Sequence, residues 1–272
     1  MKRFNLFIGL VLALFTTLAA AAPVDLLKAS SRLGSKYGYS WQDFTFDIRV
    51  DNLAFSKKVS IYYRDSDGQW KARPAVFART IDGNQEVWQA GWQRSLNSPY
   101  ETNPALDLEF VVKYEVNGNT YWDNNSGQNY QLARNSGELI TRPLLVDGAY
   151  ATAPYSYNYD GNTGSVPGSF SVGVLLKNLG YAKEVKVHYS YDNWTNVHVA
   201  NAMFQANRFL GYSNVTYPNA NGVEYWSFYT NSAEAQNSTA SEVQFAVSYK
   251  VNGVTYWDNN FGQNYRVTIT RY

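Results

Sequence analysis

The sequence predicts an all-β protein made of two tandem antiparallel β-sandwich modules, and two observations carry that prediction. First, residues 110–130 (FVVKYEVNGNTYWDNNSGQNY) recur as residues 245–265 (FAVSYKVNGVTYWDNNFGQNY), with 16 of 21 positions identical. Such self-similarity indicates a duplicated structural unit. Second, short segments of alternating apolar residues are separated by turn-forming residues, without a helical period. This pattern is typical of antiparallel sandwiches and barrels.

Each copy of the repeat predicts a β-hairpin. Asn117-Gly118 and its counterpart Asn252-Gly253 are the strongest short-range signal for a two-residue turn. Pairing across that turn places Lys113 opposite Trp122, and successive residues alternate between the two faces. The predicted core side of the first hairpin consists of Phe110, Val112, Tyr114, Val116 and Tyr121. The tryptophan therefore faces outward in both copies, as Trp122 and Trp257.

An outward tryptophan at the same place in both copies suggests a ligand. Carboxamides follow each ring, as Asn124 and Asn259, and a Gln-Asn-Tyr triplet comes after the next glycine. A flat ring beside amide donors and acceptors suits a sugar, whose apolar face stacks while its hydroxyls hydrogen-bond. Two structural alternatives stay open: the rings cover a sheet edge, and the asparagines only form turns.

The beginning of the chain predicts a secretory signal peptide at 1–22. Lys2 and Arg3 precede an apolar run, and alanines come directly before Pro23. We therefore expect an extracellular or cell-wall-associated protein. The chain has no cysteine, which excludes disulfides and zinc–thiolate sites, and no cofactor or metal is expected. A net charge of +1 gives no reason to expect nucleic acid or membrane as a partner, and we expect a monomer.

The duplication divides the mature chain into module one (23–136), a linker (137–149) and module two (150–272). The linker is flanked by loop residues, among them Arg134-Asn-Ser-Gly and Pro154. Leu144-Leu145 repeats Leu26-Leu27, so part of the linker also fits the leading strand of module two.

The strands of module one are expected from about Tyr37 onwards, because alternating apolar residues begin there. Its predicted strands are 44–50, 59–63 and 87–90, and Asp67-Gly68 turns the chain into Trp70. Module two repeats this plan at 170–176 and 185–189, where Asp192-Asn193-Trp194 corresponds to the segment of Trp70.

The hairpin signature resembles that of carbohydrate-binding module family 21. In both copies an F-x-V-x-Y strand precedes Tyr-Trp-Asp-Asn-Asn and Gly-x-Asn-Tyr. This family includes starch-binding modules of fungal glucoamylases and glycogen-targeting subunits of protein phosphatase 1. The resemblance covers nearly all of the mature chain. It is strongest to the glucoamylase type in module two, through 156–161 (SYNYDG), 177–185 (KNLGYAKEV) and 224–228 (EYWSF).

The resemblance implies an immunoglobulin-like sandwich that binds α-1,4-glucan such as starch, amylose or glycogen. It implies a first sugar site in each module, formed by Trp70, Trp122, Asn124 and Asn129 in module one and by Trp194, Trp257, Asn259 and Asn264 in module two. A second site is implied around Phe55 and Tyr181. Two positions depart from the glucoamylase pattern. Val111 and Ala246 replace a first-site aromatic residue, and Gln85 and Val223 replace a second-site one, so we expect smaller platforms.

An enzyme that acts on glycans is the main alternative. Glycoside hydrolysis usually requires two carboxylates in one cleft. Each hairpin offers only one, Asp123 or Asp258, and pairing places it on the core side. We expect it to bond backbone amides of the turn. His188 and His198 occur in one module only and form no triad pattern. We therefore expect no catalysis.

Two non-catalytic alternatives concern the partner. Recruitment of a phosphatase would require a basic-x-Val-x-Phe motif, but 57–61 (KKVSI) ends in isoleucine and lies in a predicted strand. A cell-wall or surface protein that uses the same modules for another glycan or a protein partner stays open. The sequence thus predicts a secreted, non-catalytic protein that binds α-1,4-glucan.

Overall fold

The computed structural model describes residues 22–272, apart from residues 101 and 238. In this part the protein is all-β, with one short helix, α1 (Ala233–Asn237). The predicted signal peptide, 1–22, lies outside the described residues except for its last position. No helix in the described part has the length and apolar character needed to cross a membrane.

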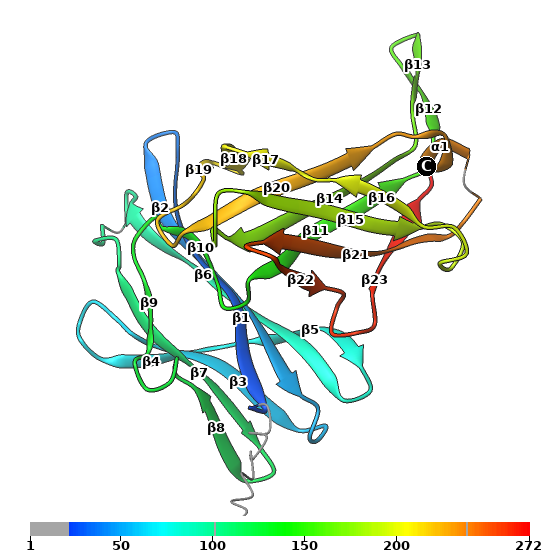
Figure 1. Cartoon of the computed structure of the whole chain (residues 1–272). Coiled ribbons are helices and arrows are strands. Elements are labelled where there is room, and N and C mark those ends of the chain that lie inside the picture. The colour runs from blue at the N-terminus through cyan, green and yellow to red at the C-terminus, as the bar shows by residue number, and fades with distance from the viewer. Residues whose placement is uncertain (1–21, 101, 238) are drawn as a thin grey trace, which may run out of the picture.

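Module one is a sandwich of two antiparallel sheets, coloured blue to green in Figure 1. One sheet has the strand order β10-β1-β2-β6-β5, and the other has β4-β3-β7-β8, with β9 paired to β7. The strands are β1 (Val24–Lys36), β2 (Tyr39–Asp51), β3 (Lys57–Arg64), β4 (Trp70–Pro74), β5 (Val76–Asp82), β6 (Gln85–Asn97), β7 (Leu108–Val116), β8 (Asn119–Asp123), β9 (Tyr130–Leu132) and β10 (Gly137–Ile140). Strand β1 precedes Tyr37, where the sequence pattern placed the first strand, so that starting point was wrong.

Module two repeats the sandwich, with the order β16-β15-β21-β23-β11-β14-β20-β17 and β22 paired to β21. Its main strands are β11 (Leu144–Thr152), β14 (Ser169–Lys177), β15 (Lys183–Ser190), β16 (His198–Asn201), β17 (Met203–Gln205), β20 (Val223–Thr230), β21 (Glu242–Val251), β22 (Val254–Asp258) and β23 (Tyr265–Thr270). Strands β11 and β23 run parallel over two residue pairs, the one exception to antiparallel pairing among the described strands.

Two small hairpins complete module two. The first, β12 (Tyr155–Tyr159) with β13 (Asn162–Val166), stands apart from the sandwich at the top of Figure 1. The second, β18 (Asn207–Leu210) with β19 (Ser213–Thr216), lies on the side of module two that faces module one.

The repeated hairpins have the predicted register. Lys113 pairs with Trp122, and Ser248 pairs with Trp257 in module two. Asn117 and Asn252 adopt positive φ together with the glycines that follow them, as a two-residue hairpin turn requires. The predicted core residues Phe110, Val112, Tyr114 and Val116 are buried, with Tyr121 packed against them. The hairpin prediction is therefore confirmed.

The segment between the modules consists mainly of strands that pair within one module or the other, and it is not an extended loop. Of the predicted linker, 137–149, the first four residues form β10, which pairs with β1. From Leu144 the chain forms β11 of module two. A small apolar cluster spans the joint and contains Ile140, Leu145, Leu175, Val215, Tyr217 and Val223. The two sandwiches therefore pack directly against each other.

The β18–β19 hairpin and the loop after it hold module one. The ring of Tyr212, at the hairpin turn, meets Trp41 edge-on at 5.9 Å. Tyr217 donates a hydrogen bond of 2.9 Å to Glu138, and Asn219 donates one of 2.8 Å to the Glu138 carbonyl. Since Glu138 is buried in β10, these contacts fix the orientation of one module relative to the other.

Candidate functional site

The outward face of module one presents three aromatic rings in contact. Tyr62 stacks on Trp70 with centroids 5.3 Å apart and planes at 16°, and it meets Trp122 edge-on at 5.9 Å. Trp122 stays 45% exposed although it lies in a sheet. The structure thus brings together the two predicted tryptophans of module one. Sequence analysis missed Tyr62, which links them.

Tyr62 fills the space beside the residue that replaces the expected aromatic. It pairs directly across the sheet with Val111, which is buried although it lies on the outward face. The alternation of β3 offered a signal, because Val59 and Ile61 point inward and Tyr62 must then point outward. Tyr62 thus adds a third ring to the platform of module one, next to Val111.

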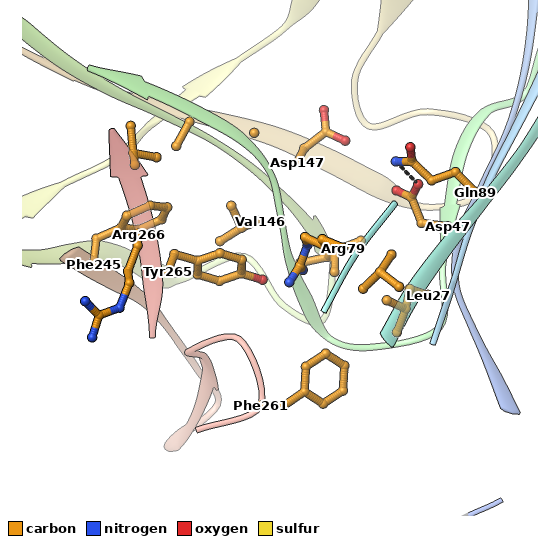
Figure 2. A pocket seen from close by; sticks show the side chains of 15 residues that line it. Leu27, Asp47, Arg79, Gln89, Val146, Asp147, Phe245, Phe261, Tyr265 and Arg266 are labelled. Atoms are coloured by element: carbon orange, nitrogen blue, oxygen red, sulfur yellow. Dashed lines mark hydrogen bonds between the residues drawn. The ribbon is translucent and has the colours of Figure 1, made fainter. Parts of the chain in front are cut away.

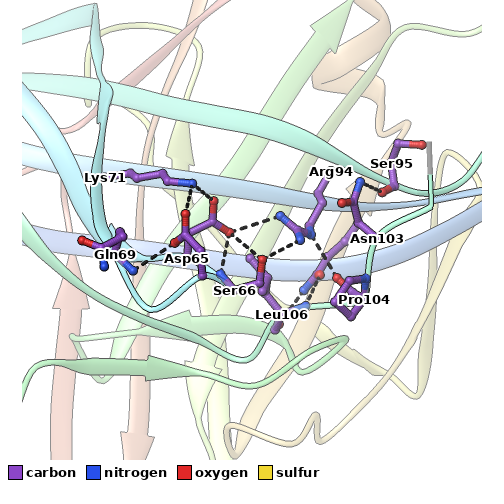
Figure 3. Close-up of polar contacts among 11 residues, drawn as sticks. Asp65, Ser66, Gln69, Lys71, Arg94, Ser95, Asn103, Pro104 and Leu106 are labelled. Carbon is purple, nitrogen blue, oxygen red and sulfur yellow. Dashed lines mark hydrogen bonds and ion pairs between the residues drawn. The ribbon is translucent and has the colours of Figure 1, made fainter. Parts of the chain in front are cut away.

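A polar network holds the turn that carries Trp70 (Figure 3). Asp65 forms ion pairs with Lys71 at 2.6 Å and with Arg94 at 3.2 Å, and Asp67 accepts from the Gln69 amide at 2.9 Å. Partial burial raises the pKa of Asp65, but the hydrogen bonds from Lys71 and Ser66 outweigh it and lower that pKa. Hydrogen bonds to Asp65 and Asp67 raise the pKa of Lys71 to about 12. The network is therefore fully charged at neutral pH.

Module two places a histidine where module one has Tyr62. His188 pairs with Ala246 across the sheet, and its ring centroid lies 4.8 Å from that of Trp257. Its Nε2 lies 2.9 Å from the hydroxyl of Ser248. Burial, together with nearby Lys186, lowers the pKa of His188. The ring is therefore neutral at pH 7, and Trp257 stands 53% exposed beside it.

Trp194 lies on the loop between β15 and β16, at a positive φ of 67°. Its backbone amide donates to Ser190 at 2.9 Å, and Asp192 accepts from the amide and side chain of Asn196 at 2.9 and 2.6 Å. These hydrogen bonds, with one from Ser190, lower the pKa of Asp192 to about 2. Unlike Trp70, Trp194 is not stacked on a described ring.

The two tryptophans of module two flank the outward side of β21 at different heights. The Trp194 loop lies beside Gln244, which donates to Asn193 at 3.1 Å, whereas Trp257 pairs with Ser248. Four residues of strand separate these positions, or about 14 Å at ~3.4 Å per residue. Trp70 and Trp122 have the same spacing along β3 in module one. There Tyr62 contacts both tryptophans, whereas His188 contacts Trp257 alone among the described rings of this face.

The predicted asparagines form the turn after each tryptophan. The side-chain oxygens of Asn124 and Asn259 accept from the amides of Gly127 and Gly262, both at 2.9 Å. Asn129 donates to Glu109 at 2.7 Å, whereas no side-chain hydrogen bond is found for Asn264 in the described part of the chain. The turn-forming role that sequence analysis left open is therefore real. Contact with a sugar stays a prediction.

The aspartate of each hairpin holds the leading strand of its module. The amides of Leu26 and Val146 donate to Asp123 and Asp258 at 2.6 and 2.7 Å, next to the β-bulges of β1 and β11. Each carboxylate also accepts from the turn amide two residues on, at 3.4 and 3.3 Å, as predicted. A tyrosine hydroxyl adds a bond of 2.9 Å in each module. Both carboxylate oxygens of each aspartate therefore accept hydrogen bonds that stabilise the fold.

The predicted second-site aromatics, Phe55 and Tyr181, are fully exposed on loops that precede β3 and β15. In module two a groove beside Tyr181 is lined by Asn178, Leu179, Phe204 and Trp226, among others. Its floor is a buried ion pair of 2.7 Å between Lys183 and Glu224. Sequence analysis did not predict Phe204, because β17 is too short to show a pattern.

Module one repeats the floor of this groove with the same residue types. Lys57 pairs with Glu86 at 2.8 Å, and Glu86 also accepts from the indole of Trp88 at 2.9 Å. The matching bond from Trp226 to Glu224 is also 2.9 Å. Phe77 meets Trp88 edge-on at 6.2 Å, much as Phe204 meets Trp226 at 6.0 Å. The duplication therefore extends to this second surface.

Two sandwiches with exposed aromatic platforms define a class of sugar-binding modules, and comparison with known proteins agrees. The model of the carbohydrate/starch-binding module family (family 21) matches residues 41–133 and 159–268. The chain belongs to this family.

Curated relatives include glucoamylase 1 of Rhizopus oryzae, 37% identical over 129 residues, which are 46% of this chain and 19% of the relative. Protein phosphatase 1 regulatory subunit 3B of Homo sapiens is 33% identical over 102 residues, which are 35% of this chain and 34% of the relative. The chain thus spans about a fifth and a third of these relatives.

Among solved structures, the starch-binding domain of Rhizopus oryzae glucoamylase, in complex with β-cyclodextrin and maltoheptaose, is 30% identical. It is matched over 99% of its length and over 43% of this chain, with a TM-score of 0.30.

Proposed function

We propose that this chain is a secreted, non-catalytic protein that binds α-1,4-glucan such as starch, amylose or glycogen through both modules. The single observation that carries the proposal is the stacked and exposed platform of Trp70, Tyr62 and Trp122. Exposed rings of this size on a sheet need a partner, and a sugar offers a flat apolar face to them. Family membership narrows the polysaccharide to starch-like glucans.

The polar residues around the rings support the same ligand. Lys113 lies with its ammonium 5.6 Å from the centre of the Trp122 ring, and Glu109 and Asn129 border the same hairpin. Donors and acceptors at the rim of a ring can hydrogen-bond the hydroxyls of a stacked glucose. In module two, Ser248, His188 and Gln244 have the same relation to Trp257 and Trp194.

The proposal that the protein is non-catalytic is supported by the geometry of its carboxylates. Asp123 and Asp258 are engaged by backbone amides and a tyrosine hydroxyl, so neither is free to act on a glycosidic bond. His188 contacts Ser248, but its described contacts include no carboxylate to orient it as a base.

A phosphatase-recruiting role, as the names of some relatives suggest, finds less support. The 57–61 stretch is the beginning of β3, with Val59 and Ile61 buried in the core and Lys57 paired with Glu86. A docking peptide must be free to leave its own sheet, which this strand is not. Secretion rests on the composition of 1–22, and amino-terminal sequencing of protein recovered from culture medium tests it.

Pull-down against granular starch, glycogen and cellulose tests the main proposal. We expect retention on starch and glycogen, little retention on cellulose, and no reducing sugar released. The variant Trp122→Ala/Trp257→Ala is the binding-deficient control, because both rings face outward and support little of the core. Equal retention on cellulose and starch, or sugar release by the purified protein, would contradict the proposal.

A further inference from the structure

A cavity of about 370 Å³ lies between the two modules, away from both platforms (Figure 2). Module one lines it with Leu27, Asp47, Arg79 and Gln89, and module two with residues 145–149, Phe261, Tyr265 and Arg266, among others. Cavities at domain junctions that combine apolar walls with a few polar groups are common ligand sites. The proposed function does not use this one, which we call the junction pocket.

The walls of the junction pocket are already held in place. Phe261 packs with Leu27, Ile81 and Val87 of module one, and the guanidinium of Arg142 lies 4.0 Å from the centre of its ring. Lys28 bridges the modules, with ion pairs of 2.9 Å to Asp47 and 2.8 Å to Asp147. A ligand would therefore meet a formed site and would not have to order it, which favours binding.

The carboxylates of the junction pocket are already paired with cations. The carboxylates of Asp47 and Asp147 are balanced by Lys28, and Arg208 adds a second partner for Asp147. No carboxylate is therefore left over to select an ammonium group, and the guanidinium of Arg79 remains as a donor. A cation that took one of these carboxylates would leave Lys28 or Arg208 without its partner, which is costly.

Unused hydrogen-bonding capacity in the junction pocket suits hydroxyl groups. Arg79 donates from one nitrogen to Asn260 at 2.8 Å, and its other donors have no acceptor in the described part of the chain. Gln89 donates to Asp47 at 2.8 Å, which leaves the amide oxygen of Gln89 as an acceptor. Tyr265 and Phe261 add apolar surface close to these groups (Figure 2). Donors, an acceptor and apolar ring surface together suit a sugar, whose hydroxyls hydrogen-bond while its apolar face stacks.

We propose that the junction pocket is a third saccharide site, which takes a glucosyl or maltosyl unit of the same α-glucan. The inference rests on the proposed function for its ligand class. The walls of this pocket come from both modules, so neither module could form it alone.

Gly148 provides the means to block the junction pocket selectively. It lines the cavity, and a Cβ added there meets no atom within 4 Å. Its φ is not in the left-handed region, so a side chain causes no backbone strain there. Gly148→Leu should therefore fill the pocket without disturbing the fold, and Gly148→Ala is the matched control with minimal added volume.

The test uses the full chain with six aromatics of the surface sites removed (Phe55→Ala, Trp70→Ala, Trp122→Ala, Tyr181→Ala, Trp194→Ala and Trp257→Ala). We expect saturable maltose binding at one site per chain by ligand-observed NMR. Gly148→Leu should weaken it about tenfold or more, equivalent to about 1.4 kcal/mol, whereas Gly148→Ala should leave it nearly unchanged. Thermal denaturation checks folding, and Gln89→Leu serves as a second blocking variant, expected to weaken maltose binding in the same direction.

The outcomes separate this inference from the proposed function. If the unmodified chain binds starch but the platform-free chain shows no saturable maltose site, the junction pocket is not a saccharide site. The same conclusion follows if Gly148→Leu and Gly148→Ala bind maltose equally. If the unmodified chain fails to bind starch or glycogen, the proposed function fails as well.

Discussion

The two copies of the WDNN turn share a backbone but perform different tasks. In module one the residue after the second asparagine is Ser126, which is exposed. In module two it is Phe261, which packs against Leu27, Ile81 and Val87 of the other module. Both residues have a positive φ, of 57° and 59°. The two turns thus have the same backbone geometry. Phe261, in place of Ser126, makes the turn of module two a contact with module one.

The platforms of the two modules also differ in their side chains. Module one has Tyr62 between two tryptophans, and module two has His188 beside Trp257, with Trp194 on a separate loop. The core residues beneath, Tyr114 and Tyr249, are both fully buried and donate to the matching carbonyls of Asp51 and Lys177. Packing thus constrains the inward face of each hairpin, whereas the outward face is free to change.

The largest effect is expected from Tyr249→Ala, which removes a core aromatic from module two. We expect module two to lose about 3–5 kcal/mol of unfolding free energy, the usual cost of such a cavity. Urea denaturation measures this, with Trp257→Ala as the outward control from the same hairpin. Comparable destabilisation by the two variants would show that the outward face also supports the core.

The second prediction concerns the joint. Phe261→Ser gives module two the residue that module one has, and it removes one of the apolar contacts between the modules. Because Phe261 is only partly buried, we expect a loss below the ~1.5–3 kcal/mol of full side-chain burial. Calorimetry should then resolve two transitions where the parent shows one. Phe209→Ser, at an exposed position, is the control and should leave a single transition.

The third prediction compares the platforms. Tyr62→Ala should weaken maltoheptaose binding at module one by about 1–3 kcal/mol, on the scale measured for stacking of bases on aromatic residues. His188→Ala should cost module two less, because an imidazole offers a smaller ring. His188→Tyr should strengthen module two. Titration calorimetry in chains whose other module is disabled measures each value. Equal losses would contradict the greater contribution of Tyr62, and no loss from Tyr62→Ala would show that its ring is not a sugar contact.

The smallest expected effect is on pH dependence. The lowered pKa of His188 means that its folded form resists protonation. Above about pH 6.5 His188 is neutral in both the folded and the unfolded chain, so it does not make stability depend on pH. Below that pH the unfolded chain takes up a proton more readily than the folded chain, so the free energy of unfolding falls. Module two should therefore weaken as the pH falls below about 6.5, whereas module one, with a tyrosine there, should not show this effect.

His188→Gln is the matched control for this pH effect, because it keeps a polar side chain that does not titrate. The loop of Trp194 should resist acid further, since the lowered pKa of Asp192 keeps its hydrogen bonds until the pH approaches about 2. Tryptophan fluorescence against pH follows both steps. An unchanged pH profile in His188→Gln would show that another group controls the response.

The features predictable from the sequence were those fixed by local rules. Asn117-Gly118 set the hairpin turn, and strand alternation then determined that Trp122 faces outward and Asp123 inward. Strand β1 was missed because polar residues such as Ser30 and Ser31 face buried space there, so its alternation is weak.

Contacts between segments far apart in the chain could not be predicted. Tyr62 becomes part of the platform only because β4 pairs with β3 and brings Trp70 over the Tyr62 ring. Phe261 finds its partners more than 170 residues earlier in the chain, so no local pattern could show that it is buried by module one. The joint between the modules is of the same kind, because β10 pairs with β1 across the whole of module one.

The measurement that tests the account most directly is the affinity of the full chain for granular starch, compared with two one-module variants. Phe55→Ala/Trp122→Ala disables module one, and Tyr181→Ala/Trp257→Ala disables module two, while the joint stays intact. Since two linked sites can act on one ligand, the unmodified chain should bind granules about 10²–10⁴-fold more tightly than either variant, whereas per-site affinity for a short maltooligosaccharide should be unchanged. If either variant matched the unmodified chain on granules, the claim that both modules bind one glucan together would be contradicted.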